Sequence, residues 1–277
     1  MRKTSIRVVC CGALVSVVFA VALSATHSWG GYHWARTTNQ FTLKMGDNLT
    51  SAAWRAHLGQ ASSDWNSGNS PVLTAVVAGT SNKRCAMVAG TTQVCNGKYG
   101  RNGWLGLASI NITGGTHITQ GSAKMNDTYF SMSTYNNPNE RQHVVCQEIA
   151  HTFGLDHQSE DGSSQNTCMD YFSNTGANAG STLSTRPNAH DFEELVIIYE
   201  HLDSTTTVAG MTAMAASNAE VDSDDPNSWG QLVKQSRNGR SSTYERFNRD
   251  GSQTLTHVFW TLEAAADCPS CDHRFDR

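Results

Sequence analysis

Residues 147–157 constrain the fold of this 277-residue chain more than any other stretch. At fixed spacing they hold Gln147, Glu148, His151, Gly154 and His157. On a helix, positions 147 and 151 lie one turn apart on the same face, so both side chains can reach one ion. Gly154 ends such a helix and lets the chain turn, which brings His157 back toward the same point. The stretch therefore predicts a helix that ends in a tight turn at a metal site.

Hydrophobic periodicity and turn residues outline the elements around this helix. Helices are predicted over 48–66, 139–153 and 189–202, and strands over 72–78, 85–88, 91–95, 104–112 and 116–126, with an entry strand within 29–45. The strands 85–88 and 91–95 are expected to form a hairpin. The inward side chains expected in the first and last helices are Trp54, Leu58, Ala61 and Trp65, and Phe192, Leu195, Val196 and Tyr199.

The amino-terminal segment has the pattern of a secretory signal. Three basic residues precede an apolar run of about 16 residues that ends in small side chains, which is short for a membrane span of about 20. We therefore expect residues 1–25 to be removed, and the protein to be secreted, extracellular or periplasmic. Removal of three of the 20 basic residues leaves 17 against 24 acidic ones, a formal charge of −7. With this charge and no basic cluster left, we expect the protein to bind neither nucleic acid nor an anionic membrane surface.

Six cysteines follow the signal, an even number that favours disulfides in an exported chain. Proximity and motif suggest three pairs: Cys85 with Cys95, Cys146 with Cys168, and Cys268 with Cys271. A site of four cysteines around zinc would need two CxxC pairs, and the chain has one. The segment 268–271 also has the form of a thiol-redox motif, but it lacks the βαβ context of such proteins.

The composition changes after residue 202. Residues 203–226 are mostly small and polar, which is typical of a flexible linker. Residues 227–277 form a C-terminal extension with a candidate hairpin from strands 241–247 and 254–260. An isolated hairpin is marginally stable, so we expect this extension to dock on the main domain or to stay mobile.

With four of the five defined positions of HExxHxxGxxH matched, and Cys168-Met169-Asp170-Tyr171 downstream, the chain resembles the metzincin clan of zinc metallopeptidases. It is most similar to secreted bacterial matrixin-like members that carry Cys-Gln-Glu at the start of the motif. The resemblance covers about residues 29–202. It implies an α+β domain with a twisted, mostly parallel sheet, an antiparallel edge strand and three helices.

The resemblance also implies roles for individual residues. Glu148 is the expected general base, which takes a proton from a zinc-bound water and passes it to the leaving amine. His151 and His157 are the expected imidazole ligands of Zn²⁺, and Gln147 stands in the place of a third. Met169 is expected at the base of the site, in a turn that the Cys146–Cys168 pair would tie to the helix. Tyr171 is a candidate partner for an oxyanion or carboxylate.

Gln147 departs from the pattern, because an amide oxygen is a weaker donor to zinc than imidazole. If Gln147 does not bind the metal, zinc has two histidine ligands and needs a third. Asp156 can ligate or support His157. His143 lies about 12 Å from His151 along a helix, too far to share an ion. For the remaining histidines we expect structural or surface roles: His27, His33, His57, His117, His190, His201, His257 and His273.

Two alternatives to an active endopeptidase stay open. The first is a metzincin-fold protein with impaired catalysis that binds peptides or serves as a scaffold. The second is a carbohydrate- or surface-binding module built on exposed aromatics; its candidates are Trp29, Tyr32, Trp34, Trp229 and Trp260. Retention of Glu148 favours the active peptidase.

We expect a monomer that acts on a peptide or protein substrate. Metzincin clefts run along an edge strand and bind extended peptides by backbone pairing. In this chain the expected edge strand is 116–126. The loops rich in Asp, Asn and Gly are candidates for Ca²⁺, although none has the spacing of an EF-hand.

Overall fold

A computed structural model describes residues 27–80, 84–208 and 223–275. The expected signal, 1–25, lies outside these ranges, as does 209–222 of the expected linker. In the described part of the chain, no helix is long and apolar enough to cross a membrane.

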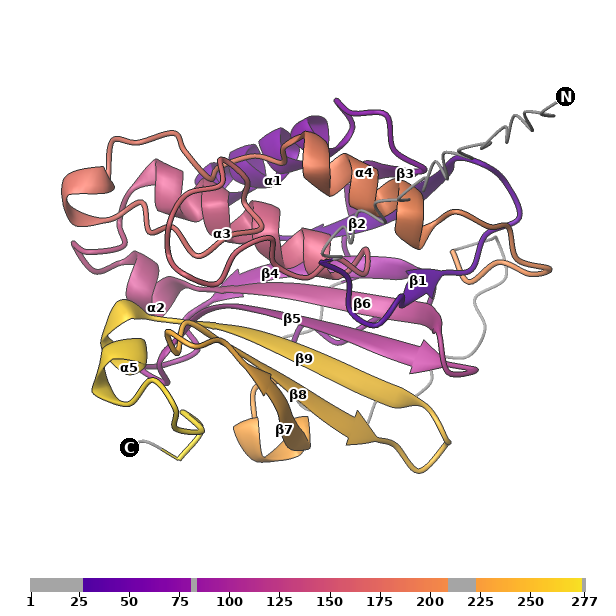
Figure 1. The fold of residues 1–277 in the computed structure, drawn as a ribbon. Helices are drawn as coiled ribbons and strands as arrows, with labels where there is room; N and C mark the ends of the chain where they lie inside the picture. Colours follow the sequence, from indigo (N-terminus) through magenta and orange to yellow (C-terminus); the bar gives the residue numbers. More distant parts are fainter. Residues whose placement is uncertain (1–26, 81–83, 209–222, 276–277) are drawn as a thin grey trace, which may run out of the picture.

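One mixed β-sheet forms the centre of the described protein (Figure 1). Its strand order is β3-β2-β4-β6-β5-β9-β8-β7, and β1 also pairs with β6. The strands are β1 (His33–Trp34), β2 (Phe41–Asn48), β3 (Val72–Ala78), β4 (Thr91–Gly97), β5 (Trp104–Thr113), β6 (His117–Asn126), β7 (Gln231–Gln235), β8 (Ser241–Phe247) and β9 (Gln253–Trp260). The pairs among β1, β2, β3, β4 and β6 are parallel. Those that join β6, β5, β9, β8 and β7 are antiparallel.

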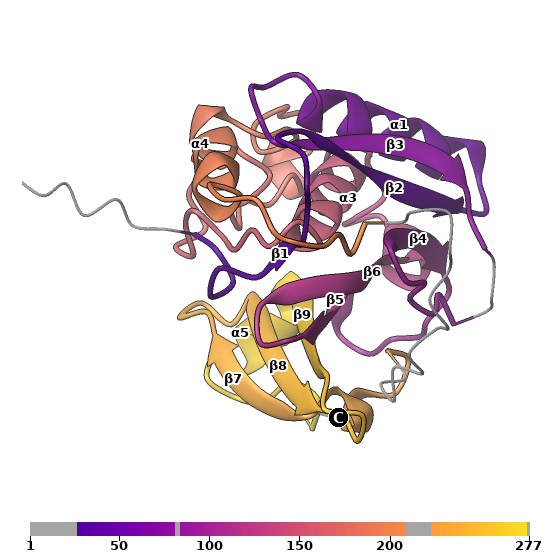
Figure 2. The same ribbon diagram turned by 90° about the vertical axis from the view of Figure 1, so that its right-hand side faces the viewer.

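The three longer helices lie together on one side of the sheet (Figures 1 and 2). They are α1 (Ala52–Trp65), α3 (Pro138–His151) and α4 (Ala189–Ile198), and the short helices are α2 (Asp127–Phe130), α5 (Leu262–Asp267) and the 3₁₀ turns Gly176–Asn178 and Pro226–Trp229. The α+β class follows directly. The mostly parallel sheet that we expected for residues 29–202 is present, with β5 as its antiparallel strand, and three C-terminal strands extend it by further antiparallel pairs.

Local signals determine where α1 and α3 begin. Ser51 accepts a hydrogen bond from the amide of Trp54 at the start of α1. Asn137 caps α3 in the same way, and Pro138 follows at the first helical position, where its missing N–H costs nothing. Gly154, three residues after α3, has a φ of 99°, and a Cβ there would lie 2.1 Å from the carbonyl oxygen of Tyr32. A side chain at this position would therefore disrupt the turn.

The predicted inward face of α1 is buried, with Trp54, Leu58, Ala61 and Trp65 all in the core. In α4 the prediction for Val196 was wrong. Leu195 and Ile198 point inward, whereas Val196 is 46 % exposed. The helix ends at Ile198, earlier than expected, and Val196 lies on its solvent face.

Two predictions about strands were also wrong. Residues 85–88 form no strand, because β4 pairs with β2 on one side and β6 on the other, which leaves no free edge for a hairpin partner. The expected edge strand, β6, lies between β4 and β5. The antiparallel strand is β5, and its outer side pairs with β9 from Trp104 to Ile112.

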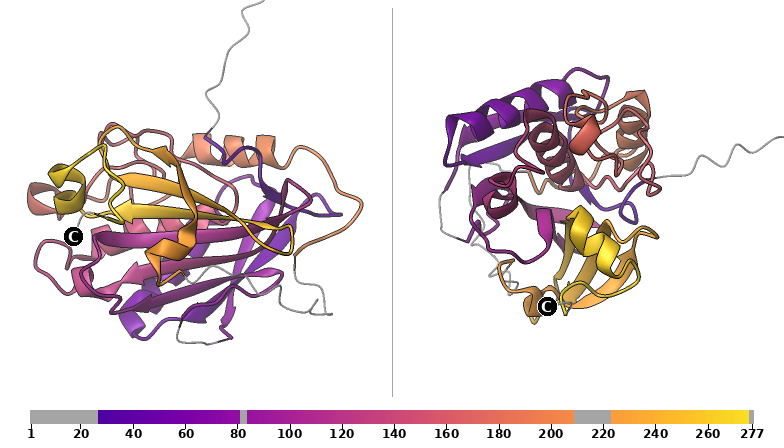
Figure 3. Two further views of the ribbon diagram at one scale, coloured as in Figure 1. Left: turned by 90° about the horizontal axis from the view of Figure 1, so that it is seen from below. Right: turned by 90° about the vertical axis from the view of Figure 1, so that its left-hand side faces the viewer.

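The C-terminal extension continues the main sheet instead of standing apart from it (Figure 3). Side chains of β9 enter two hydrophobic clusters formed by the described residues: Leu255 and Phe259 lie in the larger one, Val258 and Trp260 in the smaller. Trp29, Trp34 and Trp229 are buried as well. Because these tryptophans are core residues, the surface-binding interpretation loses the exposed aromatics on which it rested.

Candidate metal centre

Three histidines from distant parts of the chain meet at the end of α3. His151 is the last residue of the helix, His157 follows the turn at Gly154, and His257 comes from the middle of β9. One nitrogen of each ring lies within 4.8 Å of the others. The rings of His151 and His257 have centroids 4.0 Å apart, and those of His151 and His157 4.6 Å.

Hydrogen bonds orient two of these rings toward a common point. Nδ1 of His151 donates to the carbonyl oxygen of Leu155 at 2.8 Å. Nδ1 of His157 lies 3.0 Å from Oδ1 of Asp156 and 2.7 Å from the Tyr171 hydroxyl. Each Nε2 is buried and has no hydrogen-bond partner among the described residues. This is the arrangement in which a second hydrogen bond fixes the tautomer of a metal-binding imidazole.

His257 completes the set. Both of its ring nitrogens are buried without a hydrogen bond to any described residue. Burial lowers the pKa of His257 well below its usual value, and neighbouring His151 lowers it further. Burial likewise lowers the pKa of His151 strongly and that of His157. Neutral imidazole is the form that binds metals, so the site favours ligation.

Glu148 lies beside this cluster, where the sequence predicted a general base. Its two carboxylate oxygens are buried and make no hydrogen bond within the described structure, and Nδ1 of His257 is 3.6 Å from one of them. Burial raises the pKa of Glu148 well above its usual value. Gly106 of β5 makes room for it, because a Cβ at that position would lie 2.3 Å from Oε1 of Glu148.

The side chain of Gln147 makes its hydrogen bonds through the amide nitrogen. Nε2 donates to the carbonyl oxygens of Cys168 and Asp170, at 2.8 and 2.9 Å. Oε1 is buried and accepts no hydrogen bond from any described residue. Gln147 therefore holds the segment 168–170 against α3. Its amide oxygen keeps a lone pair that could bind a metal ion.

The turn below the site has the position that the sequence suggested. A disulfide joins Cys146 of α3 to Cys168, and Met169 is fully buried. Tyr171 is buried too, with its ring centroid 4.2 Å from that of His157. The Tyr171 hydroxyl lies 2.7 Å from Nδ1 of His157 and so helps to hold this ring in place. The structure also contains disulfides between Cys85 and Cys95 and between Cys268 and Cys271.

Asp156 supports His157 and is in turn paired with Lys234 of β7 at 2.6 Å. Burial opposes ionisation of Asp156, but His157 and Lys234 together hold its pKa well below the usual range. His143 is excluded from the centre as expected: its Nε2 binds the carbonyl oxygen of Asp170 at 3.0 Å.

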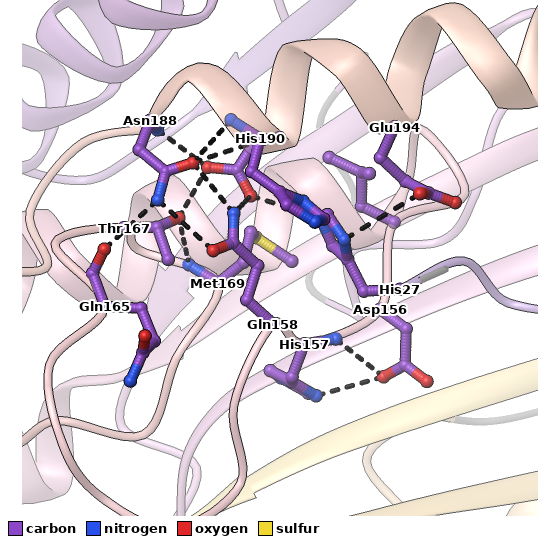
Figure 4. Close-up of polar contacts among 12 residues, drawn as sticks. His27, Asp156, His157, Gln158, Gln165, Thr167, Met169, Asn188, His190 and Glu194 are labelled. Atoms are coloured by element: carbon purple, nitrogen blue, oxygen red, sulfur yellow. Dashed lines mark hydrogen bonds and ion pairs between the residues drawn. The ribbon is translucent and has the colours of Figure 1, made fainter. Parts of the chain in front are cut away.

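A polar network joins the turn below the site to α4 (Figure 4). Asp191 accepts hydrogen bonds from Thr167 at 2.5 Å and from Gln158 at 2.8 Å, and His27 lies 3.2 Å from it. Asn188 caps α4 and also binds Gln158. These contacts fix Thr167, which precedes Met169 by two residues, and Gln158, which follows His157.

His257 was expected to have a structural or surface role, and its place among these imidazoles corrects that expectation. No spacing motif links it to His151, because the two rings meet through the pairing of β9 with β5, in which His257 lies opposite Ala108. The one signal in the sequence was the expected strand 254–260, which contains this residue. A strand partner that is distant in sequence cannot be identified from local periodicity.

Comparisons with known proteins give little. No family model matches the chain, and no curated protein matches its sequence. Among solved structures, the chain is similar to one described as the structure of Myroilysin, with 13 % identity and a TM-score of 0.33 over 60 % of this chain and 82 % of the other. A likeness this slight carries no argument about fold or function.

The donor set itself fits a transition metal. Three neutral imidazoles, each with a buried and unsatisfied nitrogen, match the ligands of catalytic zinc sites that keep one position open. An unsatisfied buried nitrogen costs free energy, and a bound ion would remove that cost.

Proposed function

We propose that this protein is a secreted metal-dependent peptidase, with Zn²⁺ held by His151, His157 and His257 and with Glu148 as general base. The observation that supports it is the meeting of three unsatisfied imidazoles with an unsatisfied carboxylate in one buried cluster. Structural imidazole sites have no need of a free carboxylate beside them, whereas hydrolysis does.

When bound, zinc supplies an electrophile for the scissile carbonyl and lowers the pKa of a water to about 7. The residues around it do the rest. Glu148, whose carboxylate oxygens lie buried beside the three imidazoles without a hydrogen bond to any described residue, accepts the proton of the attacking water and delivers it to the leaving amine. The Asp156 carboxylate and the Tyr171 hydroxyl hold His157 in place.

The described state is closed. Glu148 and His257 are fully buried, and β9 covers the side of β5 on which an extended peptide would pair. In the proposed cycle, β9 moves aside and substrate takes its place on β5.

A second candidate function is a metal-binding protein without catalysis, in which β9 never leaves. The complete burial of Glu148 favours this alternative. Both candidates place a metal ion at the three histidines. They differ in whether a substrate can reach that ion.

Zinc content tests the part that both candidates share. After dialysis, elemental mass spectrometry should find less zinc per chain in the variant His257→Ala than in the mature wild type. The variant His273→Ala, which is changed outside the centre, is the control and should keep the zinc content of the wild type. Equal zinc in the His257→Ala variant and the wild type would reject the ligand set. Cleavage of a peptide library, recorded in parallel, decides between the two candidates.

A further inference from the structure

A second group of histidines surrounds Asp203, which follows α4 and lies outside the centre described above. His33 begins β1, His117 begins β6, and His201 precedes Asp203 by two residues. Their Nε2 atoms lie 3.7, 3.1 and 3.5 Å from Oδ1 of Asp203, in that order. From the sequence, each of these histidines is expected to have a structural or surface role.

The backbone holds Asp203 so that one carboxylate oxygen faces the histidines. The amide of Asp203 donates to the carbonyl oxygen of Arg36 at 2.8 Å, and Oδ2 accepts from the amide of Arg36 at 2.9 Å. Oδ1 is therefore the oxygen that meets the rings. A carboxylate fixed by backbone contacts is preorganised for a cation, because little side-chain freedom remains to be lost on binding.

His33 provides an independent indication of a ligand. Its side chain is only 6 % exposed, and Nδ1 donates to the carbonyl oxygen of Gly31 at 2.8 Å, so Nε2 presents a lone pair. That Nε2 has no hydrogen-bond partner in the described ranges and faces Oδ1 of Asp203. Two electron-rich atoms turned toward each other in a buried place are unfavourable unless a proton or a cation lies between them.

The fold brings these four residues together through strand pairing. His33 and His117 are opposite each other in the parallel pair β1–β6, and the amide of His33 donates to Thr116 at 3.1 Å. The segment after α4 is tied to β1 by the amide of Thr207, which donates to the carbonyl of Ala35 at 3.0 Å. The cluster is thus built from three segments of an ordered core.

From this geometry we propose that His33, His201 and Asp203 form a second binding site for a transition metal, Zn²⁺ in the first instance, with His117 as the fourth ligand. The ligand atoms of His33, His201 and Asp203 already lie within 4.8 Å of one another. A tetrahedral zinc site with bonds of about 2.0–2.1 Å needs donors roughly 3.4 Å apart, which small side-chain shifts provide. Three imidazoles and one carboxylate suit zinc and its neighbours in the first transition row.

The position of the site determines how an ion would enter and which parts of the protein its binding would affect. The His117 and His201 side chains are 32 % and 53 % exposed, so an ion can enter from solvent while His33 closes the buried side. A bound ion would join the amino-terminal strand, the start of β6 and the segment after α4. Its effect would therefore be on stability, separate from any catalysis at His151.

The test is a zinc titration of the metal-stripped mature protein, followed by native mass spectrometry and by the thermal midpoint. The decisive variant is His201→Ala, because this half-exposed side chain can be removed without leaving a core cavity. His190→Ala, an exposed histidine at the start of α4, is the matched control. We expect His201→Ala to bind one zinc fewer than His190→Ala and to lose most of the zinc-induced rise in midpoint.

Equal stoichiometry in the two variants would overturn the proposal. This comparison is independent of the proposed peptidase centre, since both variants keep His151, His157 and His257. A Co²⁺ spectrum gives a second readout: the tetrahedral absorption bands assigned to this site should disappear in His201→Ala and persist in His190→Ala.

Discussion

Gln147 illustrates how far one side chain can be interpreted from sequence. Its position in the motif indicated a metal ligand, whereas the structure uses its amide nitrogen to bind two carbonyl oxygens. The motif spacing correctly located Glu148, His151 and His157 at one point, because helical geometry fixes such neighbours. It could not show where an amide would find its partners, since those partners lie across a turn.

Replacement of Gln147 by Glu separates the two roles. The change is nearly isosteric, but it turns a donor into an acceptor that faces two buried carbonyls. We expect the free energy of unfolding to fall by on the order of 3 kcal/mol. Urea denaturation measures this loss, and Gln40→Glu is the control, because its exposed amide also donates to a backbone carbonyl. A stable Gln147→Glu protein with tighter zinc binding would instead show that position 147 is a ligand.

Glu148→Gln tests the proposed base. The amide keeps the volume that Gly106 leaves for this side chain, so fold and zinc content should be unchanged. Peptide hydrolysis should fall by about 10²–10⁴-fold, the usual contribution of a general base. The measurement is kcat/KM on the best substrate of the library, with far-UV circular dichroism as the check on folding. Undiminished turnover would remove Glu148 from the mechanism.

At the scale of elements, local signals located the helices well and the strand partners poorly. Caps and apolar spacing predicted α1 and α3 to within a few residues, because these signals are contiguous in sequence. The hairpin expected at 85–95 failed because β4 pairs in parallel with strands that are distant in the chain. For the same reason, the pairing of β9 with β5 had no local signature.

A disulfide between β5 and β9 would show whether β9 has to move. Ser109 and Thr256 are opposite each other, with their hydroxyl oxygens 3.1 Å apart, which suits a double change to cysteine. If substrate pairs with β5, the locked protein should be inactive and mild reduction should restore activity. The wild type in the same reductant is the control for the native disulfides. Full activity of the locked form would mean that β9 is a fixed part of the enzyme.

At the scale of the whole molecule, one sheet connects two hydrophobic clusters. The larger lies under the helices, and the smaller lies around Trp104, Trp229 and Trp260. Because β5 and β9 contribute to both, the C-terminal extension and the main domain share their core. The change in composition after residue 202 had suggested a boundary, but composition does not report which buried surfaces meet.

This shared core predicts a single cooperative unfolding transition. Urea curves followed by tryptophan fluorescence and by far-UV circular dichroism should coincide, since β5 and β9 contribute side chains to both clusters. The variant Val258→Ala, in the smaller cluster, should lower both curves together by about 0.5–3 kcal/mol. Two separated transitions would show that the extension unfolds as an independent unit.

The position of His257 near the end of the chain has a consequence for biosynthesis. A ribosome makes the motif helix first and the third imidazole only about a hundred residues later, several seconds at ordinary rates of synthesis. During that interval the nascent chain has two of its three ligands and cannot assemble the complete centre. With the proposed ligand set, the complete centre exists only once β9 is in place, so metal loading would follow the docking of this strand.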